Sequence, residues 1–394
     1  MNKLKELINE LCPNGVKYKN IQELCKISRG KVMSKDFIKA NAGEYPVYSS
    51  QTENNGELGK ISTYDFDGEY LTWTTDGANA GSVFYRKGKF SVTNVCGLLE
   101  IKSKVMIPKF LYYVLSIEAP KYVNAGMGNP KLMSNVMAKI RVAVPPLEVQ
   151  CEIVHILDDF TLLSAELSAE LEARKRQYCY YREKLFEFNN DGELKTMGEL
   201  FPFIRNGFVG TIRPFFTDEK NGIRYLEGTN IHNGIISDNE MIYVTKEFHQ
   251  RHKKNELKED DILMVQSGHI GECAVVGKKY KGANCHALII MSNGGKCLSK
   301  YIVHYFHTLK GFKALNPAIT GGTIKHVLAG KIGKIKVPCP PIEEQTKIVN
   351  ILDKLEKLCN DISEGLPAEI EARQKQYEYY RAKLLKFKEL KVNE

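Results

Sequence analysis

Polar side chains that can discriminate nucleic-acid bases gather on turns in two separate stretches of the chain. Asn, Gln, Arg, Lys, Ser and Thr hydrogen-bond to base edges, and the basic ones among them also contact phosphates. The first stretch offers Ser50, Gln51, Thr52, Asn54, Asn55, Thr75, Asp76, Asn79, Arg86, Lys87 and Lys131, and the second offers Arg205, Asn206, Thr229, Asn230, Asn233, Gln266, Ser267, His269, Lys278, Lys279, Thr323 and Lys325. The alternative for any one residue is that it caps a turn or faces water, since the same residue types dominate ordinary turns. The residues therefore predict two sets of binding loops.

Residues for catalysis or metal binding form no recognisable pattern. The segment 271–278 has one residue too many between its glycines for a phosphate-binding loop and no Ser or Thr after its Lys. Asp260, Asp261 and Glu272 could imitate nuclease carboxylates, but solvated hairpin charges are the better interpretation. His304 and His307 lack a nearby Cys or carboxylate partner in the sequence, which favours a helix face over a metal site. We predict no catalytic centre and no metal in this chain.

A helical pattern that occurs twice must position the loops. Residues 140–188 and 335–387 each pass from a strand end through a Pro pair into a helix, because Pro cannot continue a strand ladder but can open a helix. Apolar residues then recur at alternating steps of four and three, which is coiled-coil patterning. The predicted pairing seam consists of Ile153, Leu157, Phe160, Leu167, Leu171, Tyr178, Tyr181 and Leu185 in the first copy and Ile348, Leu352, Leu355, Ile370, Tyr377, Tyr380 and Leu384 in the second. One long amphipathic helix cannot bury its own stripe, so we expect the two helices to pair, antiparallel.

The second helical copy is four residues longer than the first. Ile153 aligns with Ile348 at an offset of 195, whereas Tyr178 aligns with Tyr377 at an offset of 199. An insertion of four preserves a helical stripe but unwinds a supercoil locally. The Ser363–Pro367 segment (SEGLP) lies at that place, so we expect a kink or a short break in the distal helix.

The regions before each helix are also related to each other. Lys19–Leu24 matches Lys195–Leu200, and residues 69–94 parallel residues 260–284 through a buried strand, a Gly-bearing turn and a hairpin. The sequence predicts an α+β fold with a pseudo-two-fold internal repeat, in which two similar mixed α/β recognition domains are separated by two long antiparallel helices. The predicted boundaries are 1–144 for the first domain, 145–190 for the central helical spacer, 191–339 for the second domain and 340–394 for the C-terminal helical spacer.

Composition and charge suit a protein that binds a polyanion. Fifty-six Lys and Arg against forty-seven Asp and Glu give a formal net charge of +9. The ten cysteines have no paired spacing, which favours free thiols in a reducing compartment. The N-terminal residues predict an amphipathic helix rather than a signal peptide, and no apolar run is long enough to span a bilayer, so we expect a cytoplasmic protein. Two similar domains held at a fixed separation would read two stretches of one polymer, for which duplex DNA is the obvious candidate.

The helical segments resemble those of a known family. Pro-Pro-Leu/Ile-Glu-x-Gln-x-x-Ile-Val-x-Ile-Leu-Asp, followed by Glu-Ala-Arg-x-x-Gln-Tyr-x-Tyr-Tyr-Arg-x-Lys-Leu, occurs twice around two divergent domains, as in the specificity (S) subunit of type I restriction-modification systems. The resemblance implies a non-catalytic subunit whose two target-recognition domains each read one half of an interrupted double-stranded DNA sequence while the helices set the spacing. It also implies docking of two methyltransferase (M) subunits and of restriction (R) subunits. S-adenosylmethionine and ATP are then expected in those partners, with no cofactor in this subunit.

Two other interpretations stay open at the level of the sequence. One is a methyltransferase or nuclease fused to the same recognition module, which would modify or cut DNA unaided. The other is a coiled-coil scaffold that does not bind DNA.

Overall fold

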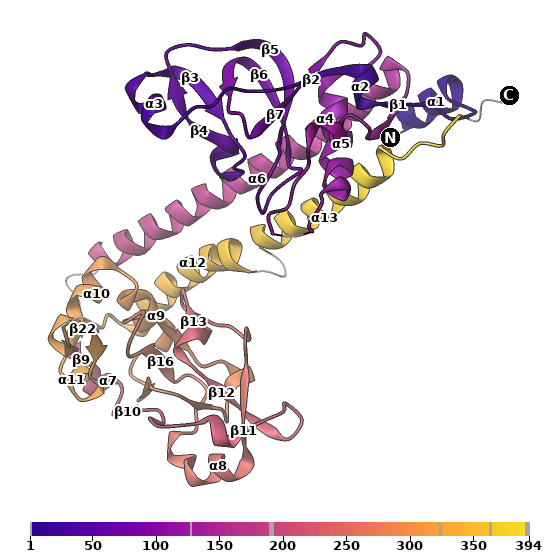
Figure 1. Ribbon diagram of the computed structural model, residues 1–394. Coiled ribbons are helices and arrows are strands. Elements are labelled where there is room, and N and C mark those ends of the chain that lie inside the picture. The colour runs from indigo at the N-terminus through magenta and orange to yellow at the C-terminus, as the bar shows by residue number, and fades with distance from the viewer. Residues whose placement is uncertain (1, 127, 189–192, 323–324, 362–364, 391–394) are drawn as a thin grey trace. The chain divides into compact units, whose positions relative to one another are not determined.

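The chain forms two compact units, each built around a mixed α/β domain (Figure 1). The computed structural model describes residues 2–126, 128–188, 193–322, 325–361 and 365–390. Unit 1 comprises Met1–Ser168 and Ile370–Glu394, and unit 2 comprises Ala169–Glu369. The long helix α6 (Leu147–Phe188) begins in unit 1 and ends in unit 2. The predicted fold class, two mixed α/β domains with a long helix between them, is confirmed, and the helical segments are shared between the two units.

A six-stranded sheet forms the body of unit 1. Its strands lie in the order β2 (Cys25–Arg29), β7 (Cys96–Ile101), β5 (Phe66–Thr74), β6 (Val83–Val92), β3 (Ala42–Tyr48) and β4 (Glu57–Ile61). A separate antiparallel pair, β1 (Lys17–Asn20) with β8 (Arg141–Val144), ends at the first Pro pair, where the ladder must stop. The helices of this unit before the long one are α1 (Asn2–Leu11), α2 (Ile21–Leu24), α3 (Lys35–Ala40), α4 (Pro108–Glu118) and α5 (Ser134–Met137).

Unit 2 divides its strands between two four-stranded sheets and three small pairs. One sheet has the order β10 (Phe203–Asn206), β19 (Leu288–Ser292), β16 (Ile262–Val265) and β17 (Cys273–Val275), and the other β11 (Phe216–Thr217), β15 (Ile242–Thr245), β12 (Gly222–Leu226) and β18 (Asn284–Cys285). The pairs are β13 (Ile231–His232) with β14 (Ile235–Ile236), β20 (Ile319–Thr320) with β21 (His326–Val327), and β22 (Lys336–Pro338) with β9 (Leu194–Thr196). Its shorter helices are α7 (Met197–Leu200), α8 (Lys246–Arg251), α9 (Ser299–Phe306), α10 (Leu309–Ala314) and α11 (Ala329–Ile332).

The internal repeat is visible in the way equivalent segments fold. The β1·β8 pair of unit 1 has its counterpart in the β9·β22 pair of unit 2, and both pairs are antiparallel. Strands β5 and β16 are also counterparts, and Trp73 and Met264, which occupy matching places in them, are both fully buried. Unit 2 departs from the repeat through its second sheet, built largely from residues 216–245.

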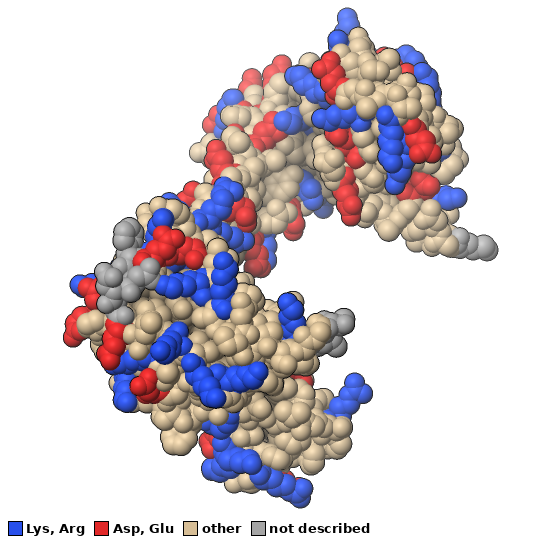
Figure 2. All heavy atoms as spheres, turned by 90° about the vertical axis from the view of Figure 1, so that its left-hand side faces the viewer, with Lys and Arg blue, Asp and Glu red and all other residues tan. Residues whose placement is uncertain are grey.

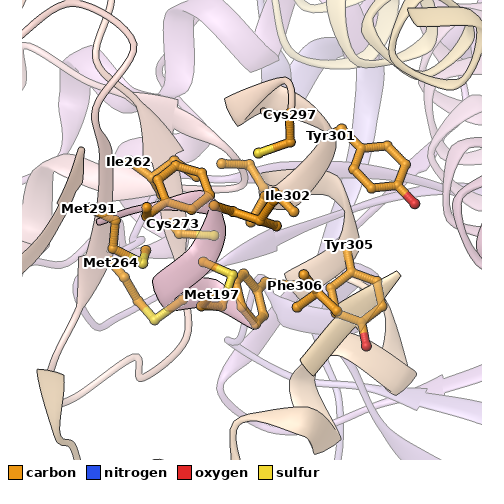
Figure 3. Packing of buried hydrophobic residues seen from close by; sticks show 14 of the residues in the cluster. Met197, Ile262, Met264, Cys273, Met291, Cys297, Tyr301, Ile302, Tyr305 and Phe306 are labelled. Carbon is orange, nitrogen blue, oxygen red and sulfur yellow. The ribbon is translucent and has the colours of Figure 1, made fainter. Parts of the chain in front are cut away.

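The core of unit 2 joins its sheet to its helices. Met197, Met264 and Met291 pack with Tyr301 and Phe306 of α9 in one continuous apolar cluster (Figure 3). Side chains of the second part of α6 and of α12 (Ile342–Asn360) belong to the same cluster. The apolar stripes of these helices are therefore buried in the core of the domain. No helix in the described ranges is long and apolar enough to cross a membrane.

Each unit contains one pairing of the long helices. In unit 1, the ring of Phe160 on α6 stacks on Tyr380 of α13 (Leu366–Leu384), with 5.6 Å between centroids. In unit 2, Tyr178 Oη on α6 donates to Glu356 Oε1 of α12 at 3.4 Å, and Tyr178, Ile348 and Leu352 are buried in one cluster. Helix α12 ends at Asn360 and α13 begins at Leu366, which is where a kink or break was expected; residues 362–364 lie outside the described residues.

Candidate nucleic-acid interface

Three loops of unit 1 meet at the carboxyl end of β5. Asp76 forms an antiparallel bridge with Lys131, and Leu132 N donates to Thr75 O at 2.9 Å, so the turn after β5 is tied to the loop that precedes α5. The side-chain amide of Asn79 donates to Thr52 Oγ1 at 2.9 Å and adds the loop after β3 to this group. Gly77 has φ +98° in the turn, a left-handed conformation that favours glycine. These contacts create one polar surface from segments distant in sequence, which we call the first loop cluster (residues 49–56, 75–81, 124–126 and 128–131).

The first loop cluster presents only part of the predicted residue set to solvent. Exposed side chains in it are those of Asn54, Asn55, Asn79 and Lys131, and half-buried ones those of Ser50, Gln51, Thr52 and Asp76; Lys87 is also exposed but lies on strand β6, outside the cluster. Asn54 and Asn55 both have positive φ, a conformation that Asn tolerates better than most residues. Lys87 lies 3.1 Å from Glu69 in an exposed ion pair.

The expectation that every one of these residues lies on an exposed turn is wrong for Thr75 and Arg86. Thr75 is 2% exposed and donates its hydroxyl to Val95 O at 2.7 Å, so it holds the turn from inside. Arg86 is 3% exposed: it lies within strand β6 rather than in a turn, and its side chain packs against Thr72 and Tyr48, whereas the neighbouring Lys87 is exposed.

Arg86 is a buried cation with no carboxylate partner among the described residues. Its Nε donates to Thr72 Oγ1 at 3.0 Å, and its guanidinium carbon lies 3.6 Å from the centre of the Tyr48 ring. Both Nη atoms are buried without a hydrogen-bond partner, and burial lowers the pKa of the group. Gly56, in the loop after β3, packs directly against the Arg86 guanidinium: a Cβ at residue 56 would come within 2.9 Å of Nη2.

Unit 2 repeats the loop arrangement at the carboxyl end of β16. Ser267 forms an antiparallel bridge with His326, and Val327 N donates to Gln266 O at 2.9 Å, as Leu132 does to Thr75 in unit 1. Asn233 N donates to Glu272 Oε2 at 2.8 Å, and the rings of His232 and His269 lie 6.0 Å apart, which adds the β13–β14 turn. We call residues 229–236, 266–271, 320–322 and 325–327 the second loop cluster.

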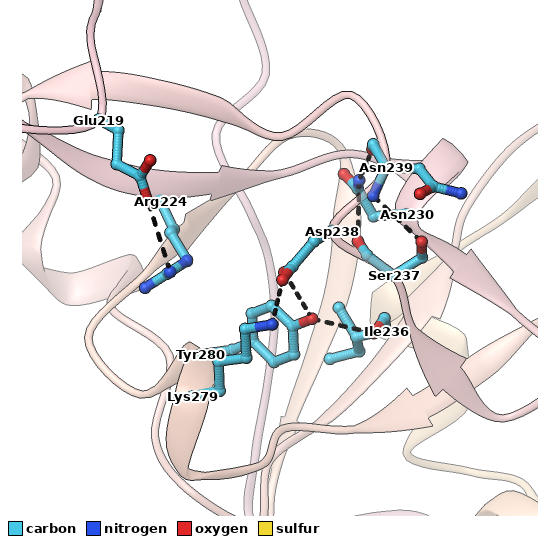
Figure 4. A network of polar contacts seen from close by, with 9 residues as sticks. All are labelled: Glu219, Arg224, Asn230, Ile236, Ser237, Asp238, Asn239, Lys279 and Tyr280. Atoms are coloured by element: carbon cyan, nitrogen blue, oxygen red, sulfur yellow. Dashed lines mark hydrogen bonds and ion pairs between the residues drawn. The ribbon is translucent and has the colours of Figure 1, made fainter. Parts of the chain in front are cut away.

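Most of the residues predicted for unit 2 are accessible. Exposed side chains are those of Asn206, Thr229, Asn233, Ser267, His269, Lys278, Lys279 and Lys325, and half-buried ones those of Arg205 and Gln266; Thr323 lies outside the described residues. Asn230 is 2% exposed, so the expectation of exposure is wrong there as well. Its amide donates to Ser237 O and Asn239 O, so it ties the residue before β13 to the segment after β14 (Figure 4).

Lys279 belongs to a second polar network drawn in Figure 4. Its ammonium pairs with Asp238, which also accepts a 2.8 Å hydrogen bond from Tyr280 Oη. The Lys279 side chain, followed by that of Tyr280, lowers the pKa of Asp238. Lys279 therefore ties the 278–281 turn to the turn after β14.

The predicted seam residues lie along the helix pairings of the separate units. In unit 1, Ile153, Leu157 and Leu384 are buried, and Phe160, Tyr377 and Tyr380 pack together. In unit 2, Tyr178, Ile348 and Leu352 are buried in the core, with Leu171, Leu185 and Leu355 packed against it. Leu167 and Ile370 are half-buried, and Tyr181 is 41% exposed.

A polar contact that was not predicted from the sequence occurs in both units between a domain helix and a long helix. Lys109 Nζ lies 2.7 Å from Asp158, and Lys300 Nζ lies 2.6 Å from Glu356 and 3.9 Å from Asp353. The signal was present in the offsets, because Lys109 with Lys300 and Asp158 with Asp353 are aligned pairs. His304, Asp353 and Glu356 bring ligand atoms within 4.8 Å of one another, but the Lys300 ammonium already supplies the positive charge there.

Basic side chains are prominent on one face of unit 2. Figure 2 shows Lys and Arg spread over this unit, in the lower part of the view, with fewer Asp and Glu among them. Such a surface suits a polyanion.

This chain is similar in sequence to the proteins of one family. The family model described as "Type I restriction modification DNA specificity domain" matches residues 13–173 and 189–372. A Mycoplasma pneumoniae protein named as a type I specificity subunit is 35% identical over 369 residues, which is 93% of this chain and 96% of the relative. The specificity subunit of the type I restriction enzyme MpnII, from the same organism, is 48% identical over 172 residues, or 43% of this chain and 52% of the relative.

Solved structures share the fold at low sequence identity. The S subunit of a type I restriction-modification system from M. genitalium has a TM-score of 0.57 at 15% identity, covering 94% of this chain and 96% of that one. A chain from a study of the assembly and conformational transition of the type I system has a TM-score of 0.58 at 14% identity, covering 95% and 98%.

Proposed function

This chain belongs to the family of type I restriction-modification specificity subunits and supplies DNA sequence specificity, and we propose that each loop cluster reads one half of an interrupted target. The first cluster then contacts one half-site and the second cluster the other. The helices α6, α12 and α13 set the distance between the half-sites.

The observation that carries this proposal is the duplicated bridge between two loops. Asp76–Lys131 in unit 1 and Ser267–His326 in unit 2 join equivalent loops at equivalent strand ends, although most of the side chains on those loops differ. Two domains that read different base sequences require a shared backbone frame with different polar side chains. The frame positions the loops on the DNA, and the side chains discriminate between bases.

Catalysis is assigned in this proposal to partner subunits. Two methyltransferase subunits, using S-adenosylmethionine, would dock on the repeated helices, and restriction subunits, using ATP, would join them. The absence of a phosphate-binding loop and of a nucleophile or metal-ligand motif in the sequence supports a subunit that binds without reacting.

A competition binding series tests the proposal. The full-length chain, alone and with methyltransferase partners, is titrated with duplexes carrying the bipartite motif found by mapping methylated adenines, in the presence of random-sequence competitor and across a range of salt. Preference for the motif duplex is expected. Equal affinity for motif and random duplexes under both conditions contradicts it, and DNA modified or cut by the purified chain unaided would favour a fused enzyme instead.

A further inference from the structure

We infer that unit 2 carries a pocket for backbone phosphates of the DNA, formed after strand β10 and beside the second loop cluster. The inference rests on the proposed function and adds the residues that would hold the sugar-phosphate backbone, three of which, Lys253, Lys254 and Lys258, lie outside the set predicted from sequence.

The pocket has the chemistry of an anion site. It has a volume of about 430 Å³, its polar lining is Arg205, Asn206, His252, Lys254 and Asn255, and neither Asp nor Glu is among the described residues that line it. A second pocket of about 320 Å³ shares Arg205 and Lys254 and is also lined by Lys253, Lys258 and Glu256. Together the two pockets gather four cationic side chains around one lining carboxylate.

The Arg205 guanidinium is held in place by hydrogen bonds from its two Nη atoms, while its Nε has no hydrogen-bond partner among the described residues. Nη1 donates to Ser292 Oγ at 2.9 Å and Nη2 to Glu256 O at 3.3 Å, while Asp261 lies 3.9 Å away. Nε is buried and has no hydrogen-bond partner in the described part of the chain. A guanidinium fixed at its two Nη atoms loses little conformational freedom on meeting a phosphate.

The lysines around Arg205 are available for a ligand. Lys253, Lys254 and Lys258 are exposed and form no ion pair with a carboxylate of the described ranges. By contrast, Lys279, on the same domain, is paired with Asp238. Unpaired lysines that line two pockets with shared residues and only one lining carboxylate repel one another, and a phosphate relieves that repulsion.

The strand topology places this pocket next to the predicted base-reading turn. β10 and β16 both run antiparallel to β19, which lies between them, so the two strands run in the same direction and Asn206 and Val265 end at the same edge of the sheet. Two strand spacings separate them, or roughly 10 Å. The major groove is about 12 Å wide, so a turn that reads bases and a phosphate pocket at this separation fit one groove and its edge.

The counterpart position in unit 1 is built differently in the part of the chain that the structure describes. Arg29, which aligns with Arg205, donates from Nε to Ser134 Oγ at 3.2 Å, so its Nε is satisfied. The segment that supplies Lys253 and Lys254 follows the second sheet of unit 2, which unit 1 lacks. The phosphate pocket is therefore specific to the second recognition domain.

A charge-matched pair of variants tests the inference. Lys253→Gln with Lys254→Gln is compared with Lys102→Gln and Lys104→Gln, two exposed lysines of unit 1 that follow β7 and so lie at the opposite end of the sheet from the turn after β5. Affinity of the full-length chain is measured for target and random duplexes across a range of salt. The first pair is expected to weaken binding to both duplexes by on the order of tenfold and to make the slope of log affinity against log salt shallower by about two. The control pair is expected to leave the slope nearly unchanged.

The outcomes separate this inference from the function on which it rests. In one outcome, the wild-type protein prefers its target while the Lys253/Lys254 variant has the same affinity and salt slope as the control. That result would overturn the phosphate pocket but leave the proposed function standing. Loss of target preference at unchanged slope also overturns it, because that result would make the lysines base readers. Wild-type protein without any sequence preference overturns the proposed function instead.

Discussion

Tyr113 Oη donates a 2.5 Å hydrogen bond to Asp158 Oδ1, and this contact fixes the domain helix α4 to the long helix α6 in unit 1. In unit 2 the aligned residues are His304 and Asp353, whose Nε2 and Oδ1 atoms lie 2.9 Å apart. The repeat keeps the carboxylate and changes its partner. The same mechanical link, domain helix to long helix, is thus made twice with different donors.

Removing the charge of Asp158 or of Asp353 is expected to weaken the link between domain helix and long helix only in the unit that contains that residue. Asp158→Asn should destabilise the attachment of α4 by about 1.5–3 kcal/mol, the usual contribution of a hydrogen bond to a charged group, and Asp353→Asn should do the same for α9. Hydrogen exchange of α4 and α9 peptides measures this. Asp159→Asn is the control, since Asp159 is exposed and lies 3.6 Å from His155. Equal loss of protection in both units from either variant would contradict independent links.

Arg86 offers a test of whether a buried cation serves recognition or only folding. Arg86→Met removes an unpaired buried charge and keeps the apolar stem, so the unfolding free energy should be unchanged or rise by about 1 kcal/mol. Because its Nη atoms lie directly under the 49–56 loop, affinity for the first half-site should nevertheless fall. Urea unfolding and duplex binding are measured together. A variant that binds with wild-type preference would show that Arg86 has no part in reading.

Exposed amides of the first loop cluster should govern one half of the target only. Asn55→Ala and Asn79→Ala are each expected to cost about 1–3 kcal/mol of discrimination at individual base pairs of one half-site. Lys87→Ala, on strand β6 outside the first loop cluster and already paired with Glu69, serves as the control. Binding to duplexes with substitutions in each half is compared, and altered preference in both halves would count against separate readers.

Lengthening the long helix should change the gap between half-sites. Four residues inserted between Ser168 and Ala169, where α6 passes from one unit to the other, add roughly 6 Å of helix, which is close to two base-pair steps. The preferred gap should shift by one or two base pairs while each half-site stays the same. Selection from duplexes with randomised gaps measures the preferred gap. An unchanged gap would contradict the proposal that the long helices set the distance between the half-sites.

His307 predicts a stability loss in mild acid. Burial, with Arg182, His304 and Lys300 nearby, lowers the pKa of His307 to about 3, although Glu272 lies 3.7 Å away. Its Nε2 also accepts a hydrogen bond from Cys273 N, which requires the neutral ring. The unfolded chain takes up a proton near pH 6.5 and the folded chain does not, so stability falls as pH drops from 6.5, by up to about 1.4 kcal/mol per unit. His307→Gln should flatten this dependence in thermal unfolding between pH 7 and pH 5; an unchanged slope would argue against a buried neutral His307.

Much of the architecture could be predicted from the chain because it depends on periodicity. The alternation of four and three from Ile153 to Leu185, the Pro pairs and the offsets between Tyr178 and Tyr377 are local or repetitive signals, so they predict helices, boundaries and duplication. The candidate site was only partly predictable. Thr75, Arg86 and Asn230 have the same residue types as the polar residues that are exposed on these loops, and nothing in their spacing distinguishes them.

By itself, the sequence determined the repeat, the helical stripes and the polar character of the loops, since these follow from residue order and type. Only the tertiary structure decided which polar side chains face solvent and which loops meet, because the Asp76–Lys131 and Ser267–His326 bridges join segments more than fifty residues apart. It also brought Lys254 beside Arg205, from segments that follow β15 and precede β11 in the chain. Long-range pairing depends on how strands and helices pack around a common core, and no local pattern records it.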